Sequence, residues 1–455
     1  MQRLKIGTSW VRGVVGEALT PDLVVNFACA FGTWCDGGAV VIGRDTRGSS
    51  RMMRAAVTSG LLSSGCEVID LGLSSTPFVS FAVRELGADG GISITGSHND
   101  AEWNALKFVG PDGALLNAVK SEELLDIYHA SHFRLAAWNE LKPVTHDGGL
   151  STRYRAHLLA ALDVETISAR GFKVAVDFCN GAGAETARPF LEALGATLVP
   201  VNEEPTGIFA HPPAPTAANM RVLAEQVTAH RADIGAGLNV DGDRVGFVTR
   251  DGVALSEEYT LPIAAGARLR RHPGPIVINL STSSMVEAVA AKHKYSVRRA
   301  AVGESHVVDQ GMAEGAVLAG EGSGGVAALP ASLTFDALLT LGLVLEEMAA
   351  ASLSLQELVD RLPRFTMRKH ELPCPPNVVY KVVEAFRTRY ADHDPDCTDG
   401  VRVQFPDAGW MHARASNTEP LLRVIVEAAT PMRADALLAE SLAFARRTMK
   451  AAGEP

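Results

Sequence analysis

The sequence predicts an α/β protein with three similar α/β domains in tandem, built on mixed or parallel sheets, and a C-terminal α+β domain. One pattern occurs three times: a short apolar run, a polar turn, and a helix-like segment with apolar residues three or four positions apart. Strands that alternate with helices indicate parallel sheets covered by helices. The section from about Met367 instead places several strands before a terminal helix, which is typical of an α+β domain.

The three repeats begin with predicted strands at residues 39–43, 172–178 and 275–280, each bounded by turn residues. Apolar runs of this length suit strands that are buried on both faces. The first following helix runs through Met53, Val57 and Leu61, and the others cover 185–195 and 285–293. The last section is predicted to hold a helix over 378–390, strands within 400–406, 409–416 and 421–429, and a helix from about Arg433.

A chain of 455 residues is too long for one hydrophobic core. Polar, proline and glycine residues interrupt the pattern near 146–151, 251–257 and 362–368. We therefore expect domains over residues 1–149, 150–252, 253–365 and 366–455, carrying in turn the serine, metal, sugar and phosphate loops described below.

Composition excludes several classes of function. The net charge of -10 argues against a general nucleic-acid binder, which needs a positive surface. No run of about 18 apolar residues is present, so no membrane span is expected. The six cysteines form no C-x-x-C pair, and the N-terminus lacks the apolar run of a secretory signal. We expect a cytoplasmic protein with reduced thiols.

The first candidate loop is ISITGSHND, residues 92–100. A short strand ends here, and Gly96 lets the backbone turn so that Ser97 projects beyond the strand, where ligands of open α/β sheets bind. Such a serine could carry a phosphoryl group through a covalent intermediate. The alternative is a polar turn in which Asn99 caps the next helix.

The second loop is GLNVDGDRVGFV, residues 237–248, in which Asn239, Asp241 and Asp243 alternate. Clustered oxygen ligands suit Mg²⁺, and Arg244 could hold a phosphate oxygen. The alternative is an acidic surface turn. The loop is too short for an EF-hand.

The third loop, AGEGSGG at residues 319–325, exposes Glu321 and Ser323 among glycines. A carboxylate can accept hydrogen bonds from two sugar hydroxyls, so the loop fits hexose recognition, and a flexible surface loop is the alternative.

The fourth loop, RASNTEPLLR at residues 414–423, gathers hydrogen-bond donors that suit a phosphate dianion. An ordinary hairpin is the alternative. Its donors are Arg414, Ser416, Asn417, Thr418 and Arg423.

In this order, the four loops resemble those of the α-D-phosphohexomutase family. Further motifs support the resemblance over essentially the whole chain: IGTSWVRGVVGEALTP at the start, GRDTRGSS from Gly43, and EWNALKF from Glu102. The resemblance implies four domains around a central cleft, with one loop from each domain. It further implies a small-molecule sugar phosphate as the partner, with no nucleic acid or membrane, and a monomer or homodimer is expected.

The resemblance also implies roles for residues. Ser97 would be the phosphoserine, beside a Mg²⁺ bound by Ser97, Asn239, Asp241 and Asp243. The candidate catalytic residues are Ser97, Lys107 as general acid or base, Arg12, Arg244 and His98. Substrate contacts would come from Glu321, Ser323, His306 and the five fourth-loop residues Arg414, Ser416, Asn417, Thr418 and Arg423.

The implied activity is interconversion of hexose or hexosamine 1-phosphate and 6-phosphate, for glucosamine, mannose or glucose. The reaction would pass through phospho-Ser97 and a bound sugar 1,6-bisphosphate, which also serves as activator. Four positions depart from the family pattern. Asn239 stands where an aspartate is usual and Gly325 where a histidine is usual, while Trp10 replaces a glycine and Asp100 a proline. The first departure keeps a non-catalytic sugar-phosphate binding or regulatory protein as the alternative. A phosphatase that hydrolyses the phosphoserine is a third hypothesis.

Overall fold

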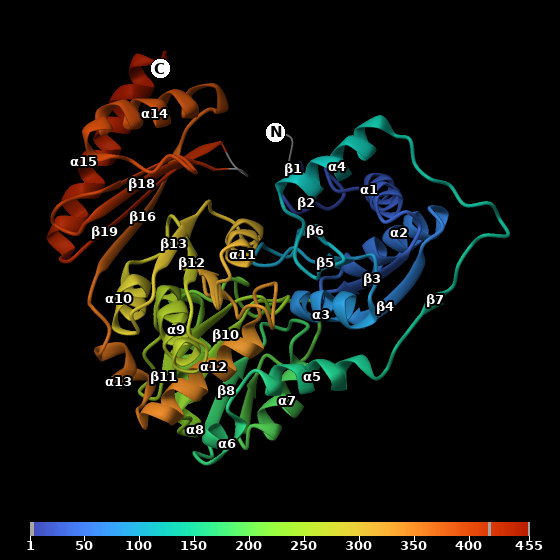
Figure 1. Cartoon of the computed structure of the whole chain (residues 1–455), viewed down its shortest axis with the longest axis horizontal. Helices are drawn as coiled ribbons and strands as arrows, with labels where there is room; N and C mark the ends of the chain where they lie inside the picture. Colours follow the sequence, from blue (N-terminus) through green and yellow to red (C-terminus); the bar gives the residue numbers. More distant parts are fainter. Residues whose placement is uncertain (1–3, 417–419, 454–455) are drawn as a thin grey trace.

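The computed structural model describes residues 4–416 and 420–453, which form four domains in chain order (Figure 1). The N-terminal domain lies on one side of the molecule, the two middle domains lie together, and the C-terminal domain stands apart from the N-terminal one (Figure 1). The predicted four-domain α/β architecture is confirmed. The exact domain boundaries stay predictions.

Domain I is built on a mixed sheet with the strand order β1-β2-β6-β5-β3-β4-β7. Strands β3, β4, β5 and β7 are parallel, whereas β1, β2 and β6 join antiparallel. The predicted first strand and helix are confirmed as β3 and α2. The strands are β1 (Leu4–Ile6), β2 (Trp10–Val14), β3 (Ala39–Arg44), β4 (Glu67–Leu73), β5 (Gly90–Ile94), β6 (Trp103–Val109) and β7 (Val144–Thr145). The helices are α1 (Pro21–Trp34), α2 (Ser50–Ser63), α3 (Thr76–Leu86) and α4 (Ala118–Ala130).

Domains II and III each have a smaller sheet, with the orders β11-β10-β8-β9 and β13-β12-β14-β15. In each, parallel strands are extended by one antiparallel edge strand, β11 or β15. The strands are β8 (Lys173–Asp177), β9 (Thr197–Val201), β10 (Ile234–Leu238), β11 (Val245–Thr249), β12 (Ile276–Asn279), β13 (Val297–Ala300), β14 (Leu318–Glu321) and β15 (Gly325–Ala327). The α-helices are α5 (Leu150–Ala160), α6 (Val164–Ser168), α7 (Ala184–Ala193), α8 (Arg221–His230), α9 (Thr260–Arg271), α10 (Met285–Lys292), α11 (Glu304–Ala313), α12 (Ala337–Ala351) and α13 (Leu355–Asp360), with short 3₁₀ turns η1 (Ala217–Asn219) and η2 (Glu257–Tyr259).

Domain IV is an antiparallel sheet, in the order β16-β19-β18-β17, packed against two helices. The predicted strands are present, and β16, which the sequence analysis did not predict, adds an edge strand. Both helices begin earlier than predicted, because proline favours the first helical position. The elements are β16 (Thr366–Pro373), α14 (Pro376–Arg389), η3 (Ala391–His393), β17 (Val401–Gln404), β18 (Trp410–Ala415), β19 (Leu421–Ala428) and α15 (Pro431–Ala451).

Apolar packing joins the first three domains, whereas the described residues of the fourth form a separate apolar cluster. One buried cluster contains Phe78 of domain I, Tyr154 and Leu162 of domain II, and Leu339 of domain III. Domain IV has a cluster of its own around Phe386. Domain IV meets domain III through polar contacts, among them Arg402 Nε, which donates to the Leu280 carbonyl at 3.1 Å, and the Ser284 N–H, which donates to Glu427 Oε1 at 2.9 Å. Within the described residues, no helix is long and apolar enough to cross a membrane.

Candidate active site

A cavity of about 430 Å³ lies where the four domains meet. It brings together most of the side chains predicted as functional, although they come from segments as far apart in the sequence as Arg12 and Arg423. Its lining includes Arg12, Ser97, His98, Lys107, Asp243, Arg244, His306, Glu321, Ser323, Arg414, Ser416 and Arg423. Asn239 and Asp241 are not among the lining residues, and hydrogen bonds join them to this group. The predicted contacts Asn417 and Thr418 lie outside the described residues.

Ser97 stands on a strained turn at the carboxyl end of β5. Its φ of +50° is in the left-handed region, which non-glycine residues adopt at a cost and which is found at functional sites. Arg47 stabilises the loop. Its side chain is fully buried and donates hydrogen bonds to the carbonyl oxygens of Ser97, Asn99 and Asp100. The Ser97 backbone N–H donates to Thr95 Oγ1 at 2.9 Å. The turn is thus fixed before any ligand binds.

The predicted metal loop is the tight turn between β10 and β11. Gly242, with a φ of +66°, supplies the left-handed residue of the turn. The Thr76 N–H, at the start of α3, donates to the Asp241 carbonyl at 2.9 Å, and the Ala337 N–H, at the start of α12, donates to the Gly242 carbonyl at 3.0 Å. Domains I and III therefore clamp this domain II loop against Ser97.

Lys107, which points from β6, is paired with both carboxylates of the loop. Its Nζ lies 2.7 Å from Asp241 Oδ2 and 2.5 Å from Asp243 Oδ2, and all three side chains are buried. Burial alone would lower the pKa of Lys107, but the two carboxylates outweigh it and raise that pKa above its ordinary value. Likewise, burial would raise the pKa of Asp243, and the positive charges of Lys107 and Arg244 lower it instead. This places a salt-bridged ammonium group beside Ser97.

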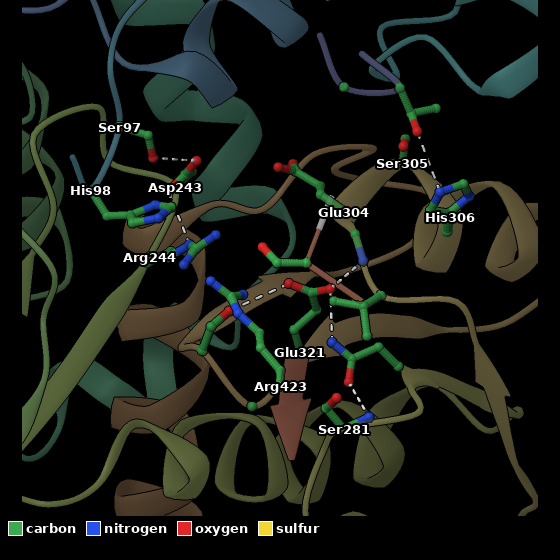
Figure 2. A pocket seen from close by; sticks show the side chains of 18 of the residues that line it. Ser97, His98, Asp243, Arg244, Ser281, Glu304, Ser305, His306, Glu321 and Arg423 are labelled. Atoms are coloured by element: carbon green, nitrogen blue, oxygen red, sulfur yellow. Dashed lines mark hydrogen bonds and ion pairs between the residues drawn. The ribbon is translucent and has the colours of Figure 1, made fainter. Parts of the chain in front are cut away.

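Two guanidinium groups add positive charge on the same side of the cavity. Arg12 Nη1 donates to Asn99 Oδ1 at 2.5 Å, and burial, followed by repulsion from Arg244, lowers the pKa of Arg12 to about 10. His98 lies beside them, and burial together with the charges of Arg244 and Arg12 lowers the pKa of its imidazole well below the usual value. Figure 2 shows Ser97, His98, Asp243 and Arg244 grouped together in this part of the pocket. The site is therefore suited to an anion, with a neutral imidazole beside it.

Asn239 joins the cluster in an orientation that differs from the expectation. Its amide oxygen accepts hydrogen bonds from the backbone N–H groups of Asp243 and Arg244, at 3.1 and 3.0 Å. Its amide nitrogen instead faces Ser97 Oγ at 3.3 Å, Asp241 Oδ1 at 2.9 Å and Asp243 Oδ1 at 2.6 Å. The sequence suggested an amide oxygen offered to a metal ion, whereas the loop's own backbone already uses that oxygen.

The sugar-loop carboxylate Glu321 ends β14 and faces the cavity. Its Oε1 accepts from Asn279 Nδ2 at 2.8 Å and from the Gly303 N–H at 2.7 Å, while Ser323 Oγ lies 3.5 Å from Oε2. These contacts fix the carboxylate with Oε2 less heavily bonded than Oε1. His306, on α11, lies at the cavity wall with Nε2 3.4 Å from Thr8 Oγ1.

The fourth loop places two arginines side by side. Arg414 of β18 is paired in register with Arg423 of β19, and like charges in such cross-strand pairs repel each other. Arg414 Nε lies 2.9 Å from Asp399 Oδ2, and Arg423 Nε lies 3.2 Å from Glu371 Oε1. A bound dianion between the two guanidinium groups would relieve their repulsion.

Sequence reasoning missed several cavity residues. Glu304 begins α11 and accepts the Phe335 N–H at 2.7 Å; burial, with Asp243 nearby, raises its pKa to about 8. Lys369 of domain IV reaches Glu258 of domain III at 2.8 Å. The only available signal for Glu304 was its position two residues before His306, and the Lys369 contact joins segments with no common motif.

Comparisons with known proteins cover nearly the whole chain. Residues 3–135, 152–252 and 256–365 match phosphoglucomutase/phosphomannomutase α/β/α domains I, II and III, and residues 376–443 match the corresponding C-terminal domain. The chain is 34% identical over 451 residues to a probable phosphoglucosamine mutase of Pyrococcus abyssi, with 98% of each chain covered. It is 34% identical over 438 residues to a phosphoglucomutase/phosphomannomutase of Thermococcus kodakarensis, covering 94% of this chain and 95% of the relative. A crystal structure of a phosphoglucomutase/phosphomannomutase family protein from Burkholderia thailandensis superposes with a TM-score of 0.84 at 28% identity, covering 98% and 96% of the two chains.

Proposed function

The chain belongs to the phosphoglucomutase/phosphomannomutase family, and on that premise we propose that it interconverts the 1-phosphate and 6-phosphate of a hexose or hexosamine. One observation carries the proposal. Ser97 opens into the same cavity as the Glu321 carboxylate and the Arg414–Arg423 pair. A sugar phosphate bound in this cavity would therefore lie near a serine that can carry a phosphoryl group, a carboxylate that can bind sugar hydroxyls, and an arginine pair that can bind a phosphate.

In the proposed reaction, phospho-Ser97 gives its phosphoryl group to a sugar hydroxyl, forming a bound sugar 1,6-bisphosphate. The bisphosphate turns end for end, and its other phosphoryl group returns to Ser97. A phosphoserine carries about -1.5 to -2 charges. Lys107, Arg12 and Arg244 line the cavity around it with positive charge. Catalysis of phosphoryl transfer depends mostly on positioning the groups and neutralising the charge on the phosphoryl oxygens.

Two further groups near Ser97, Lys107 and His98, have different roles in proton transfer. Lys107 is held as an ammonium ion, so it can donate a proton or a hydrogen bond but cannot accept one. His98 is a neutral imidazole whose buried Nδ1 has no hydrogen-bond partner among the described residues. We therefore assign acceptance of the attacking hydroxyl's proton to His98. Lys107, which shares Asp243 Oδ2 with Ser97 Oγ, would support the phosphoryl oxygens and supply the proton that Ser97 Oγ takes up when its bond to phosphorus breaks.

The carboxylates of Asp241 and Asp243 fit a divalent cation by their chemistry, since Mg²⁺ prefers hard oxygen ligands. They would hold Mg²⁺ beside Ser97, where it supplies further neutralisation of phosphoryl charge when bound. The Arg414–Arg423 pair, with Ser416, would hold the phosphate that is not reacting, whichever carbon bears it. The polar contacts of domain IV would let it close over the bound sugar and exclude water.

The test starts from the purified protein. We expect intact-mass measurement to find one covalent phosphoryl group on the wild type and none on Ser97→Ala. Conversion of the 1-phosphate to the 6-phosphate should require Ser97, with Mg²⁺ and a trace of sugar 1,6-bisphosphate present. Ser168→Ala, at an exposed position on domain II, should behave as the wild type. A wild-type protein that is unphosphorylated and inert under these conditions would contradict the proposal.

The same assay selects the sugar and separates the alternatives. Glucose, mannose and glucosamine phosphates compared side by side should give one preferred kcat/KM. Tight binding of a sugar phosphate without turnover would instead favour the binding or regulatory protein, and steady release of inorganic phosphate would favour a phosphatase. The cytoplasmic location and the monomeric or dimeric state stay predictions.

A further inference from the structure

The hydrogen bonds around Asn239 leave its amide with one possible orientation. The oxygen faces two backbone N–H groups, of Asp243 and Arg244, and the nitrogen faces the carboxylates of Asp241 and Asp243. Exchanging the two atoms would set N–H against N–H and oxygen against carboxylate. Amide orientation is assigned from such networks, and here all four partners agree. The side of Asn239 that faces Ser97 is therefore the donor side.

Donors of this chain already occupy every oxygen of the two carboxylates. The two Oδ1 atoms accept hydrogen bonds from Asn239, and the two Oδ2 atoms accept from Lys107. Asp241 Oδ2 also accepts from Thr76 Oγ1 at 2.8 Å. An amide nitrogen has no lone pair to offer to a metal ion. The loop thus provides two carboxylates and an amide donor at the positions where three oxygen ligands were expected.

We propose that Asn239 is a hydrogen-bond donor to the phosphoryl-bearing oxygen of Ser97 and not a metal ligand, and that it weakens divalent-cation binding at this loop. The donor function follows from the amide nitrogen's position 3.3 Å from Ser97 Oγ, with Asn239 itself 1% exposed. The weakening follows because the loop has one ligand and one negative charge fewer. This inference rests on the proposed function only in assigning a phosphoryl group to Ser97.

Two substitutions of Asn239 distinguish a hydrogen-bond donor to Ser97 from a metal ligand at this position. Asn239→Asp adds the missing carboxylate, so we expect Mn²⁺, used as the probe, to bind roughly 10- to 100-fold more tightly. Asn239→Ala removes the amide without adding charge. A donor predicts that Mn²⁺ affinity stays the same or rises in Asn239→Ala, whereas a ligating oxygen predicts that it falls about tenfold or more.

Free Mn²⁺ is measured by electron paramagnetic resonance during titration of each protein, without sugar and with the phosphorylation state checked by intact mass. Asn377→Asp, which adds the same charge at an exposed site on α14, should leave the affinity unchanged. Wild-type affinity equal to that of Asn239→Asp, or a clear loss in Asn239→Ala, would overturn the inference. The result does not depend on turnover, so an inactive protein would refute the proposed function while leaving this test valid.

Discussion

Replacing Arg47 by methionine removes the buried guanidinium group that supports the serine loop. Arg47 donates to the carbonyl oxygens of Ser97, Asn99 and Asp100, at 2.8, 2.6 and 2.5 Å, and pairs with Asp45 at 2.9 Å. Removing one partner of a buried ion pair costs about 3–5 kcal/mol, because the remaining charge stays buried and unpaired. We expect the free energy of opening the serine loop to fall by the same amount, about 3–5 kcal/mol.

Hydrogen exchange of residues 95–103 in the full chain measures that opening. Since each 1.4 kcal/mol is a tenfold change, exchange in Arg47→Met should be roughly 10²- to 4 × 10³-fold faster than in the wild type. Arg51→Met, at an exposed position on α2, is the matched control and should leave exchange of the loop unchanged. An Arg47→Met protein whose loop exchanges within about threefold of the wild-type rate would refute the reasoning from buried-charge cost.

Three further outcomes are expected. Burial lowers the pKa of His412 to about 4, so the free energy of unfolding of domain IV should fall by about 3 kcal/mol as the pH falls from 6.5 to 4. His412→Gln should remove this pH dependence, measured by urea unfolding that is followed by hydrogen exchange of domain IV. Burial raises the pKa of Glu304 to about 8, so kcat/KM should fall above pH 8 as a carboxylate forms near the substrate phosphate, and Glu304→Gln should remove that ionisation from the pH profile. Tyr154→Phe takes away the hydroxyl that donates to Asp336 at 2.7 Å and should cost about 1–3 kcal/mol in thermal unfolding, whereas Tyr380→Phe at the surface should cost nothing measurable.

The sequence alone located the four loops because each carries an unusual combination of side chains, and the first and fourth also follow predicted strands. The predicted strands and helices of the repeats are present for the same reason, since their apolar spacing matches burial in the structure. The strand β16 escaped prediction because it pairs with β19, more than 40 residues later, and its half-buried sequence lacks a clear alternation.

The chemistry between the loops was harder to predict. Lys107 reaches Asp241 and Asp243 across 134 and 136 residues, and the orientation of Asn239 depends on backbone N–H groups as well as on those carboxylates. Spacing within a motif shows which atoms are available but does not show which of them the fold already uses. Glu304 was missed for a related reason, because only the folded chain brings the start of α11 to the cavity.

The clamp on the β10–β11 turn also bears on how the protein is made. Ser97 leaves the ribosome long before Asp241 and Asp243 are translated, and both arginines of the fourth loop come later still. Until then, Lys107 lacks its two carboxylate partners, and the cavity lacks the Arg414–Arg423 pair. A chain truncated before residue 239 therefore carries Ser97 without the two carboxylates that pair with Lys107 in the complete fold.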